Sequence, residues 1–369
     1  MEEGFLVRDA FNERVVKKLA SDIKKTWKKL DSTGFVSDVL SGFNDLGLTE
    51  RMQRITTCLA EYLPDDFPKA VKILLDSLGP IPATVPGKTN WDAFILVPQT
   101  MFVAEKGLDH FEISLDALKV MTPYFSSESA VRPFFVKHPK KMLKLFALWV
   151  SDEDEHVRRL VSEGCRPRLP WAMRLHMFVK DPKPVLKLLE LLKEDESLYV
   201  RRSVANNLND IAKDHPDLVV GVLKKWKKID NKGTQWLIKH AARTLLKQGH
   251  TGALALLGYH SPQVEWGNFV VDKNISFYGN FCFQFDFVSS VDQDLMIDYI
   301  LYFMKANGKL APKVFKLSKK KVFAGEQIVF KKKHSFRKIS TRVYYPGKHA
   351  LEIMINGKKF DRKEFTLKR

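Results

Sequence analysis

Two stretches of the chain repeat one another at an offset of 43 residues. The first runs from Asp152 to Trp171 and the second from Asp195 to Pro216. Each has an acidic lead-in followed by Val-Arg-Arg, at 157–159 and again at 200–202. An offset near 40 residues indicates a structural repeat, and a repeat constrains the fold more than any other feature of this sequence.

Two further runs indicate which helices accompany the repeated stretches. His138-Pro139 opens a run ending at Trp149, and His215-Pro216 opens one ending at Trp226. Both prolines suit a first helical turn, where no N–H is needed. Looser copies of the pattern occur at 130–132 and 238–243. Helix pairs repeating at this length are typical of HEAT-like α-solenoids, whose units bury their apolar faces only against neighbours. The prediction is a helical domain over residues 1–260.

The period changes after Ser261-Pro262. Phe281, Phe283, Phe285 and Phe287 alternate with Cys282, Gln284 and Asp286, which predicts a half-buried strand, and Asn356-Gly357 suits a tight hairpin turn. Further short strands are expected at 295–304, 314–317, 327–330, 340–345, 351–355 and 365–367. About seven strands in roughly one hundred residues favour an immunoglobulin-like β-sandwich over residues 263–369, with a small barrel as the alternative.

Positive charge is concentrated at the C-terminal end. The net charge is +18, and residues 305–369 hold 20 Lys and Arg against 4 Asp and Glu, leaving 41 against 39 for the first 304 residues. Such asymmetry indicates a polyanionic partner. Two lysine runs flank one predicted hairpin and are candidate DNA contacts: Lys319, Lys320 and Lys321, and Lys331, Lys332 and Lys333. The alternative is that they protect a solvated sheet edge.

Acidic side chains sit among arginines in the two repeated stretches. Arg159, Glu163 and Arg166 are four and three residues apart, which places them on one face of a helix. Asp210 has a comparable place in the second stretch. An ordinary ion-pair ladder on the surface would also explain this pattern. The acidic lead-ins, with Asp152 and Asp195, are expected to cap the helices that follow.

The motifs VRRLVSEGCRPRLPWA and YVRRSVANNLNDIAKDHPD resemble those of the DNA alkylation-repair glycosylases built from HEAT-like repeats. The likeness is to the AlkC branch, which also carries a C-terminal immunoglobulin-like domain. The resemblance implies base excision repair of duplex DNA, with hydrolysis of the N-glycosidic bond of 3-methyladenine and 3-methylcytosine, without base flipping or a cofactor. It implies that Glu163, Asp210 and Glu128 are catalytic, that Trp171 packs beside the lesion, and that Arg159 clamps a phosphate. Further residues expected at the lesion or DNA are Arg166, Arg202, Asn206, Asn207, Trp236 and His240.

Other interpretations remain open at this stage. Glu128 can instead be an acid favoured by the dipole of a first helical turn, and Trp236 and His240 can belong to the core. A non-enzymatic HEAT-repeat scaffold that binds nucleic acid or an acidic protein is the alternative function. The chain has no long apolar run, its three cysteines are isolated, and its histidines lack metal-site spacing. We therefore expect a soluble intracellular protein without a metal site. The resemblance further implies a monomer in the bacterial cytoplasm.

Overall fold

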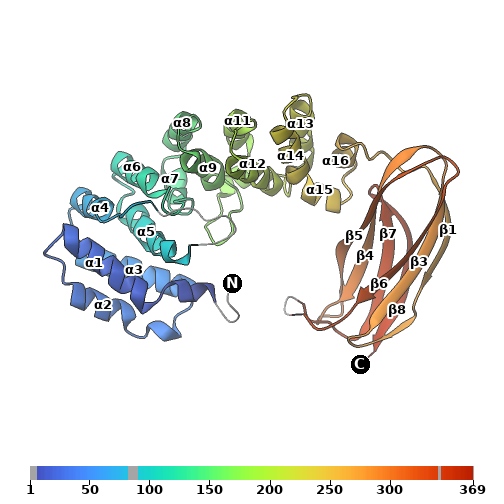
Figure 1. Cartoon of the computed structure of the whole chain (residues 1–369), viewed down its shortest axis with the longest axis horizontal. Coiled ribbons are helices and arrows are strands. Elements are labelled where there is room, and N and C mark those ends of the chain that lie inside the picture. The colour runs from blue at the N-terminus through green and yellow to red at the C-terminus, as the bar shows by residue number, and fades with distance from the viewer. Residues whose placement is uncertain (1–5, 82–89, 340–341, 369) are drawn as a thin grey trace. The chain divides into compact units, whose positions relative to one another are not determined.

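The structure is a computed structural model that describes residues 6–81, 90–339 and 342–368 (Figure 1). The described residues form helices followed by strands, as the repeat and the later alternation predict. In chain order, with η for a 3-10 helix, the elements are η1 (Val7–Ala10), α1 (Glu13–Thr26), α2 (Ser32–Leu40), η2 (Phe43–Asp45), α3 (Leu48–Tyr62), α4 (Phe67–Asp76), η3 (Trp91–Ile95), α5 (Leu96–Lys106), α6 (Phe111–Met121), α7 (Arg132–Lys137), α8 (Pro139–Trp149), α9 (Glu155–Gly164), α10 (His176–Lys180), α11 (Lys183–Leu192), α12 (Leu198–Ile211), α13 (Pro216–Trp226), α14 (Lys232–Ala241), α15 (Arg243–Lys247), α16 (Thr251–Leu256), β1 (Val264–Val271), β2 (Asn274–Ser276), β3 (Asn280–Ser289), β4 (Gln293–Met304), β5 (Leu310–Val322), β6 (Gln327–Ser335), β7 (Gly347–Ile355) and β8 (Lys358–Lys368).

The chain divides into two compact units. The first comprises Met1–Asp214 and Asn231–Leu237, and the second comprises His215–Asp230 and Ile238–Arg369. The second unit therefore contains α13, α15 and α16 as well as the β-strands. Within the described ranges, no helix is both long and apolar enough to span a membrane.

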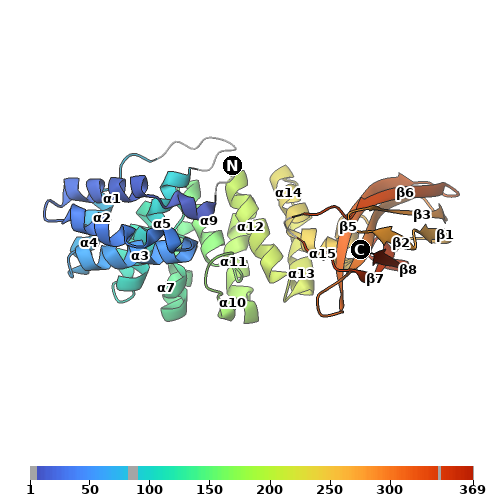
Figure 2. The same cartoon turned by 90° about the horizontal axis from the view of Figure 1, so that it is seen from below.

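Equivalent helices of successive repeats pack on one another in the first unit. α8 lies against α11 in one layer, and α9 lies against α12 in the other. The view from below shows α9 and α12 side by side (Figure 2). Each inner helix buries one apolar stripe: Val200, Val204, Leu208 and Ile211 recur every three or four residues along α12 and are all buried. The predicted helical repeat is confirmed, and both His-Pro runs form helices that begin at the proline and end at the tryptophan.

The first arginine of each Val-Arg-Arg fastens its helix to the loop before it. Arg158 Nη1 donates to both carbonyls of residues 152–153 at 2.9 Å. Arg201 Nη1 donates to both carbonyls of residues 195–196 at 2.5 and 2.7 Å. Arg158 Nε also donates to the Asp195 carboxylate of the next repeat at 2.7 Å. The first arginine of the motif therefore has a structural role, and in the first of the two repeats it also joins that repeat to the next.

The expected helix caps lie two residues further along the chain. Asp154 caps α9 by accepting from the His156 N–H, and Ser197 caps α12 by accepting from the Tyr199 N–H. Asp152 and Asp195 accept instead from the backbone N–H of these capping residues, at 3.0 and 2.8 Å. The cap prediction was wrong for Asp152 and Asp195, because a side chain two residues before the cap can reach the cap's own N–H but not those of the first turn.

The strands of the second unit form two sheets. One has the order β1-β3-β6 and the other β2-β8-β7-β4-β5. The four alternating phenylalanines of β3 all point into the core between the sheets, while Cys282 is exposed. The immunoglobulin-like sandwich is confirmed. The Asn356-Gly357 turn is confirmed as well, since it joins antiparallel β7 and β8 with both residues at positive φ.

Three details of the predicted sandwich differ. β1 and β2 were not expected, and their low burial explains why: β1 has one fully buried residue and β2 is three residues long. The strand expected at 340–345 includes two residues outside the described ranges, and residues 342–345 contribute only an isolated bridge between Ile339 and Arg342. The lysine runs do not flank a hairpin, because β5 and β6 belong to different sheets and the chain crosses the sandwich between them.

The Asn356-Gly357 turn also holds the start of the sandwich. The Asn356 side-chain amide donates to the carbonyls of His260 at 2.8 Å and Asp294 at 3.0 Å, and its oxygen accepts from the Met296 N–H at 2.7 Å. A Cβ on Gly357 would lie 2.4 Å from the carbonyl oxygen of Gly249. The turn is therefore pressed against the helical segment that precedes the sandwich within the second unit.

Candidate active site

Two buried carboxylates stand at the ends of adjacent inner helices. Glu163 precedes the last residue of α9 and is 4% exposed, and Asp210 precedes the last residue of α12 and is 2% exposed. The C-terminal end of a helix carries partial negative charge, which disfavours an acid by about 0.3 to 1 kcal/mol. Burial adds a larger penalty unless the charge is paired. Both placements therefore require compensation from neighbouring groups.

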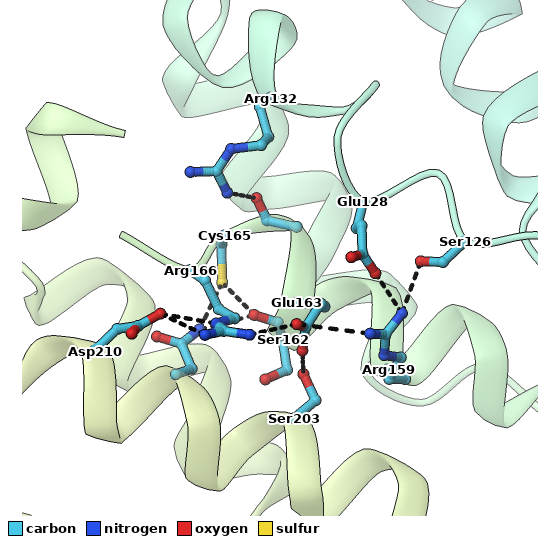
Figure 3. Close-up of polar contacts among 12 residues, drawn as sticks. Ser126, Glu128, Arg132, Arg159, Ser162, Glu163, Cys165, Arg166, Ser203 and Asp210 are labelled. Atoms are coloured by element: carbon cyan, nitrogen blue, oxygen red, sulfur yellow. Dashed lines mark hydrogen bonds and ion pairs between the residues drawn. The ribbon is translucent and has the colours of Figure 1, made fainter. Parts of the chain in front are cut away.

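Arg166 supplies this compensation by bridging the two acids. Its Nη1 donates to Glu163 Oε1 at 2.5 Å, and its Nε donates to Asp210 Oδ2 at 2.8 Å (Figure 3). The Ser203 hydroxyl donates to the second oxygen of Glu163 at 2.5 Å, and Lys213 Nζ donates to the second oxygen of Asp210 at 2.9 Å. All four carboxylate oxygens thus accept a hydrogen bond, which holds both side chains in fixed positions.

Arg159 extends the arrangement toward the preceding repeat. Its Nη2 lies 3.6 Å from Glu163 Oε1, and its Nη1 donates to Glu128 at 2.5 Å and to the Ser126 hydroxyl at 2.8 Å. The guanidinium lies 4.9 Å from the ring centre of Tyr199. The result is a chain of alternating charges, which we call the carboxylate chain: Lys213, Asp210, Arg166, Glu163, Arg159 and Glu128.

The carboxylate chain keeps Glu163 ionised. Burial by itself would raise the pKa of Glu163, but Arg159, Arg166 and the Ser203 hydroxyl together hold that pKa below its ordinary value. Burial alone would lower the pKa of Arg166, but Glu163 and Asp210 together raise that pKa above its ordinary value. Three acids and three bases make the set neutral as a whole, so Glu163 offers a fixed negative charge at neutral pH without a large net field.

A family model described as "DNA alkylation repair enzyme" matches residues 115–245, which include the whole carboxylate chain. A second, described as "Uncharacterised protein YhaZ, C-terminal Ig-like domain", matches residues 267–369. Among curated proteins, YhaZ of Bacillus subtilis is 38% identical over 98% of this chain and 99% of its own length. Among solved structures, the alkylpurine DNA glycosylase AlkC of Pseudomonas fluorescens, bound to DNA containing an abasic site analog, is similar with a TM-score of 0.89. It is 34% identical, and the match covers 99% of this chain and 100% of AlkC.

The chain belongs to the AlkC family. The resemblance found in the repeated motifs is thereby confirmed, and so is the combination of a helical repeat with an immunoglobulin-like domain. The similarity extends through both compact units, so the β-sandwich is part of the AlkC-like architecture.

Trp171 lies apart from the carboxylate chain, on the loop that joins α9 to α10. Its side chain is 85% exposed, and its backbone has φ 58°, a conformation that non-glycine residues seldom adopt. The same loop carries Arg166. In this AlkC-family member, one loop therefore connects an exposed aromatic ring to the bridge between the two acids.

The remaining predicted residues lie in different settings. Arg202 is exposed on α12, Asn206 is half-buried there, and Trp236 and His240 are half-buried on α14. Asn207 is fully buried, and its side-chain amide donates to the Ser162 carbonyl of α9 at 2.8 Å. This position makes Asn207 a packing residue between repeats, so its assignment to the DNA-contacting surface was not correct.

The lysine runs lie on the sandwich, with all six residues exposed. Lys320 donates to Glu326 at 2.7 Å, while Lys319 and Lys321 lie over the rings of Tyr259 and Phe323. Lys331, Lys332 and Lys333 lie within β6 and border a surface groove with Asp272 and Gln284.

Sequence reasoning missed two polar groups of the site. Ser203 corresponds by the 43-residue offset to Leu160, a buried apolar residue of α9. A polar residue at a core position of the repeat was therefore a usable signal. The role of Arg132 was not predicted, although residues 130–132 keep the repeated pattern loosely. Its side chain is 0% exposed and lies beside the end of α9, where its Nη1 donates to the Gly164 carbonyl at 2.9 Å (Figure 3).

Proposed function

We propose that this protein hydrolyses the N-glycosidic bond of cationic N3-alkylated bases, 3-methyladenine and 3-methylcytosine, in duplex DNA. Membership of the AlkC family supports the broader class: the protein is a DNA glycosylase that acts on alkylated bases. The observation that carries the finer proposal is the pair of buried carboxylates, Glu163 and Asp210, which Arg166 bridges at the ends of adjacent helices.

The chemistry of an N3-alkylated base explains why two carboxylates suffice. Alkylation gives the base a positive charge, so it departs as a neutral molecule and needs little acid assistance. The deoxyribose then acquires oxocarbenium character, as sugars do in glycoside hydrolysis. Glu163 or Asp210 stabilises that positive charge and directs a water molecule to C1′. The water oxygen forms the new bond, its proton passes to a carboxylate or solvent, and the product is an abasic site.

Further groups around the acids are assigned to the duplex. Trp171 is an aromatic surface available to the damaged nucleotide or its sugar, since most of its ring area faces solvent. Arg159 and Arg202 are proposed phosphate contacts, and Glu128 is a third acid that orients Arg159. A lesion presented to this exposed surface need not leave the helix, which restricts the substrates to bases whose own charge makes the bond labile.

The sandwich is proposed to contact phosphates beside the lesion. Its lysine runs on β5 and β6 provide two exposed basic strands, and phosphate contacts supply much of the affinity of DNA-binding proteins. We further propose that the protein acts as a monomer in the bacterial cytoplasm, with residues 1–260 carrying the chemistry and residues 263–369 contributing affinity.

An abasic-site assay tests this function directly. Duplexes of one sequence, each containing 3-methyladenine, 3-methylcytosine or no lesion, are incubated with excess protein and then cleaved at abasic sites. The proposal requires strand cleavage only with the two alkylated duplexes. A protein that binds all three duplexes and releases no base from any would be the non-enzymatic HEAT-repeat scaffold instead.

A further inference from the structure

The loop from Cys165 to Leu175 brings two parts of the site together. It carries Arg166, which bridges Glu163 and Asp210. It also carries Trp171, whose side chain is exposed and whose own backbone φ is 58°. A non-glycine residue in such a conformation costs about 1 to 3 kcal/mol and persists only when its surroundings hold it. Whatever holds this loop also controls where both side chains lie.

Arg132 binds the backbone near both ends of this loop. Its Nη1 donates to the carbonyl of Gly164, the last residue of α9, at 2.9 Å. Its Nε donates to the carbonyl of Met173 at 2.7 Å. A further bond from the Leu175 N–H to the Pro167 carbonyl, at 3.3 Å, closes the same segment. One guanidinium therefore spans the points where the loop leaves α9 and returns toward α10.

This arrangement is expensive for the folded protein. Arg132 is completely buried, and its Nη2 has no partner within the described residues. An unsatisfied buried donor costs about 1 to 3 kcal/mol, and more when it is charged. Burial also lowers the pKa of Arg132 to about 10. An apolar side chain of similar length would avoid these costs but would leave the carbonyls of Gly164 and Met173 without their donor. The buried charge is therefore tolerated where it holds this loop.

We propose that Arg132 is a positioning residue, which fixes the Cys165–Leu175 loop so that Arg166 and Trp171 are correctly placed for the reaction. The inference rests on the proposed function for its effect on rate, while the effect on the loop is independent of it. Arg132 touches no substrate, because its side chain is fully enclosed by protein.

The chain offers a matched control in Arg51. This arginine is also buried, at 6% exposure, and its guanidinium donates only to backbone carbonyls, those of Phe11 at 2.9 Å, Arg8 at 3.1 Å and Leu46 at 3.2 Å. It belongs to α3 and the N-terminal helices. Arg132→Met and Arg51→Met therefore remove the same kind of interaction, a buried guanidinium that donates to backbone carbonyls. One lies beside the proposed site and the other is elsewhere in the helical part of the chain.

The experiment compares Arg132→Met, Arg132→Lys and Arg51→Met in the full-length chain, below the melting temperature of each. With saturating enzyme, Arg132→Met should slow single-turnover base release by about 10- to 100-fold, the size expected from displacing reacting groups by about an ångström. Arg51→Met should stay within twofold of the parent. Arg132→Lys keeps the charge and should recover part of the rate. Affinity for undamaged duplex should change little in all three.

A second measurement follows the loop itself. Trypsin cleavage after Arg168 or Arg174 should accelerate at least fivefold in Arg132→Met and remain unchanged in Arg51→Met, whether or not the protein releases bases. Adding Trp171→Ala to Arg132→Met should cost less than the product of the two separate effects, because both act through one loop. Unchanged cleavage, or a rate loss that merely follows the unfolded fraction, would overturn the positioning role. If Arg132→Met does not fold, Arg132→Lys decides the same two measurements. Loop loosening in a protein that releases no base would refute the proposed function and leave the structural role of Arg132 standing.

Discussion

Replacing Glu163 with glutamine removes one negative charge from the carboxylate chain and keeps the side chain's shape. Arg159 would retain Glu128, and Arg166 would retain Asp210, so neither arginine would be left without an acid. The amide can still meet Ser203 and one guanidinium. We therefore expect a loss of only about 2 to 3 kcal/mol in the free energy of unfolding, below the roughly 3 to 5 kcal/mol seen when a buried ion pair loses a partner outright.

The effect on rate follows from the charge that develops on the sugar. A carboxylate about 4 Å from a unit positive charge contributes about 4 kcal/mol at an effective dielectric constant near 20, or about 10³ in rate. Glu163 shares its charge with Arg159 and Arg166, and the oxocarbenium charge is partial. We expect Glu163→Gln to lower the single-turnover rate by about 10², with unchanged or slightly tighter binding to DNA.

The assay is base release from 3-methylcytosine duplex at saturating enzyme, with melting temperature measured in the same buffer. Asp214→Asn is the control, because it breaks an ion pair with Arg168 that joins the same two repeats outside the carboxylate chain. Since the pKa of Glu163 lies below its ordinary value, the parent enzyme should keep its rate as pH falls from 7 to 5. A Glu163→Gln enzyme with the parental rate at saturation would refute the electrostatic role of this residue.

Three further predictions come from the arginine motif and the sandwich. Arg202→Ala should weaken binding to damaged and undamaged duplex alike and reduce the salt slope by about one, whereas Arg201→Ala should lower the melting temperature and leave the slope unchanged. Replacing all three lysines of the run 331–333 with glutamine should flatten the slope of log affinity against log salt by up to about three. The same replacement of the run 319–321 should have a smaller effect, because those side chains already contact protein groups. Burial raises the pKa of Asp298 to about 6, so its contribution to stability is present below its ordinary pKa and lost as pH rises through 6. Asp298→Asn should therefore increase the free energy of unfolding by up to about 3 kcal/mol at pH 8 and leave it unchanged at pH 4. Melting temperatures measured at the two pH values check this, and equal shifts at both would contradict it.

The repeat period explains why part of the site was predictable. Residues 43 positions apart occupy equivalent places in adjacent inner helices, and Asp210 lies four residues, about one helical turn, beyond the equivalent of Glu163. The two acids therefore come near one another once α9 packs on α12. The i, i+3 and i, i+4 spacings then brought Arg166 and Arg159 to Glu163.

The groups that escaped prediction depend on tertiary geometry. Arg132 reaches Gly164 and Met173 across 32 and 41 residues, and neither target carbonyl has a sequence signature. Asn207 has the composition of a DNA contact, but its place on α12 turns it toward Ser162. In the sandwich, local strand patterns say nothing about which sheet a strand joins, so the crossing between β5 and β6 could not be seen in the lysine runs.

The Asn356-Gly357 turn limits how separable the sandwich is from the helices before it. Its amide bonds the His260 carbonyl, and its glycine fits against Gly249 with no room for a side chain. The sandwich therefore contacts the segment before residues 261–262 directly, and these two residues are not a flexible linker. α15, α16 and the sandwich should lose structure in one cooperative transition, and a recombinant fragment of the sandwich should include both helices. A chimera that joins the sandwich of one relative to the helices of another at residue 262 would place this turn against a helix surface that does not match it. The last helices and the sandwich should therefore be exchanged together.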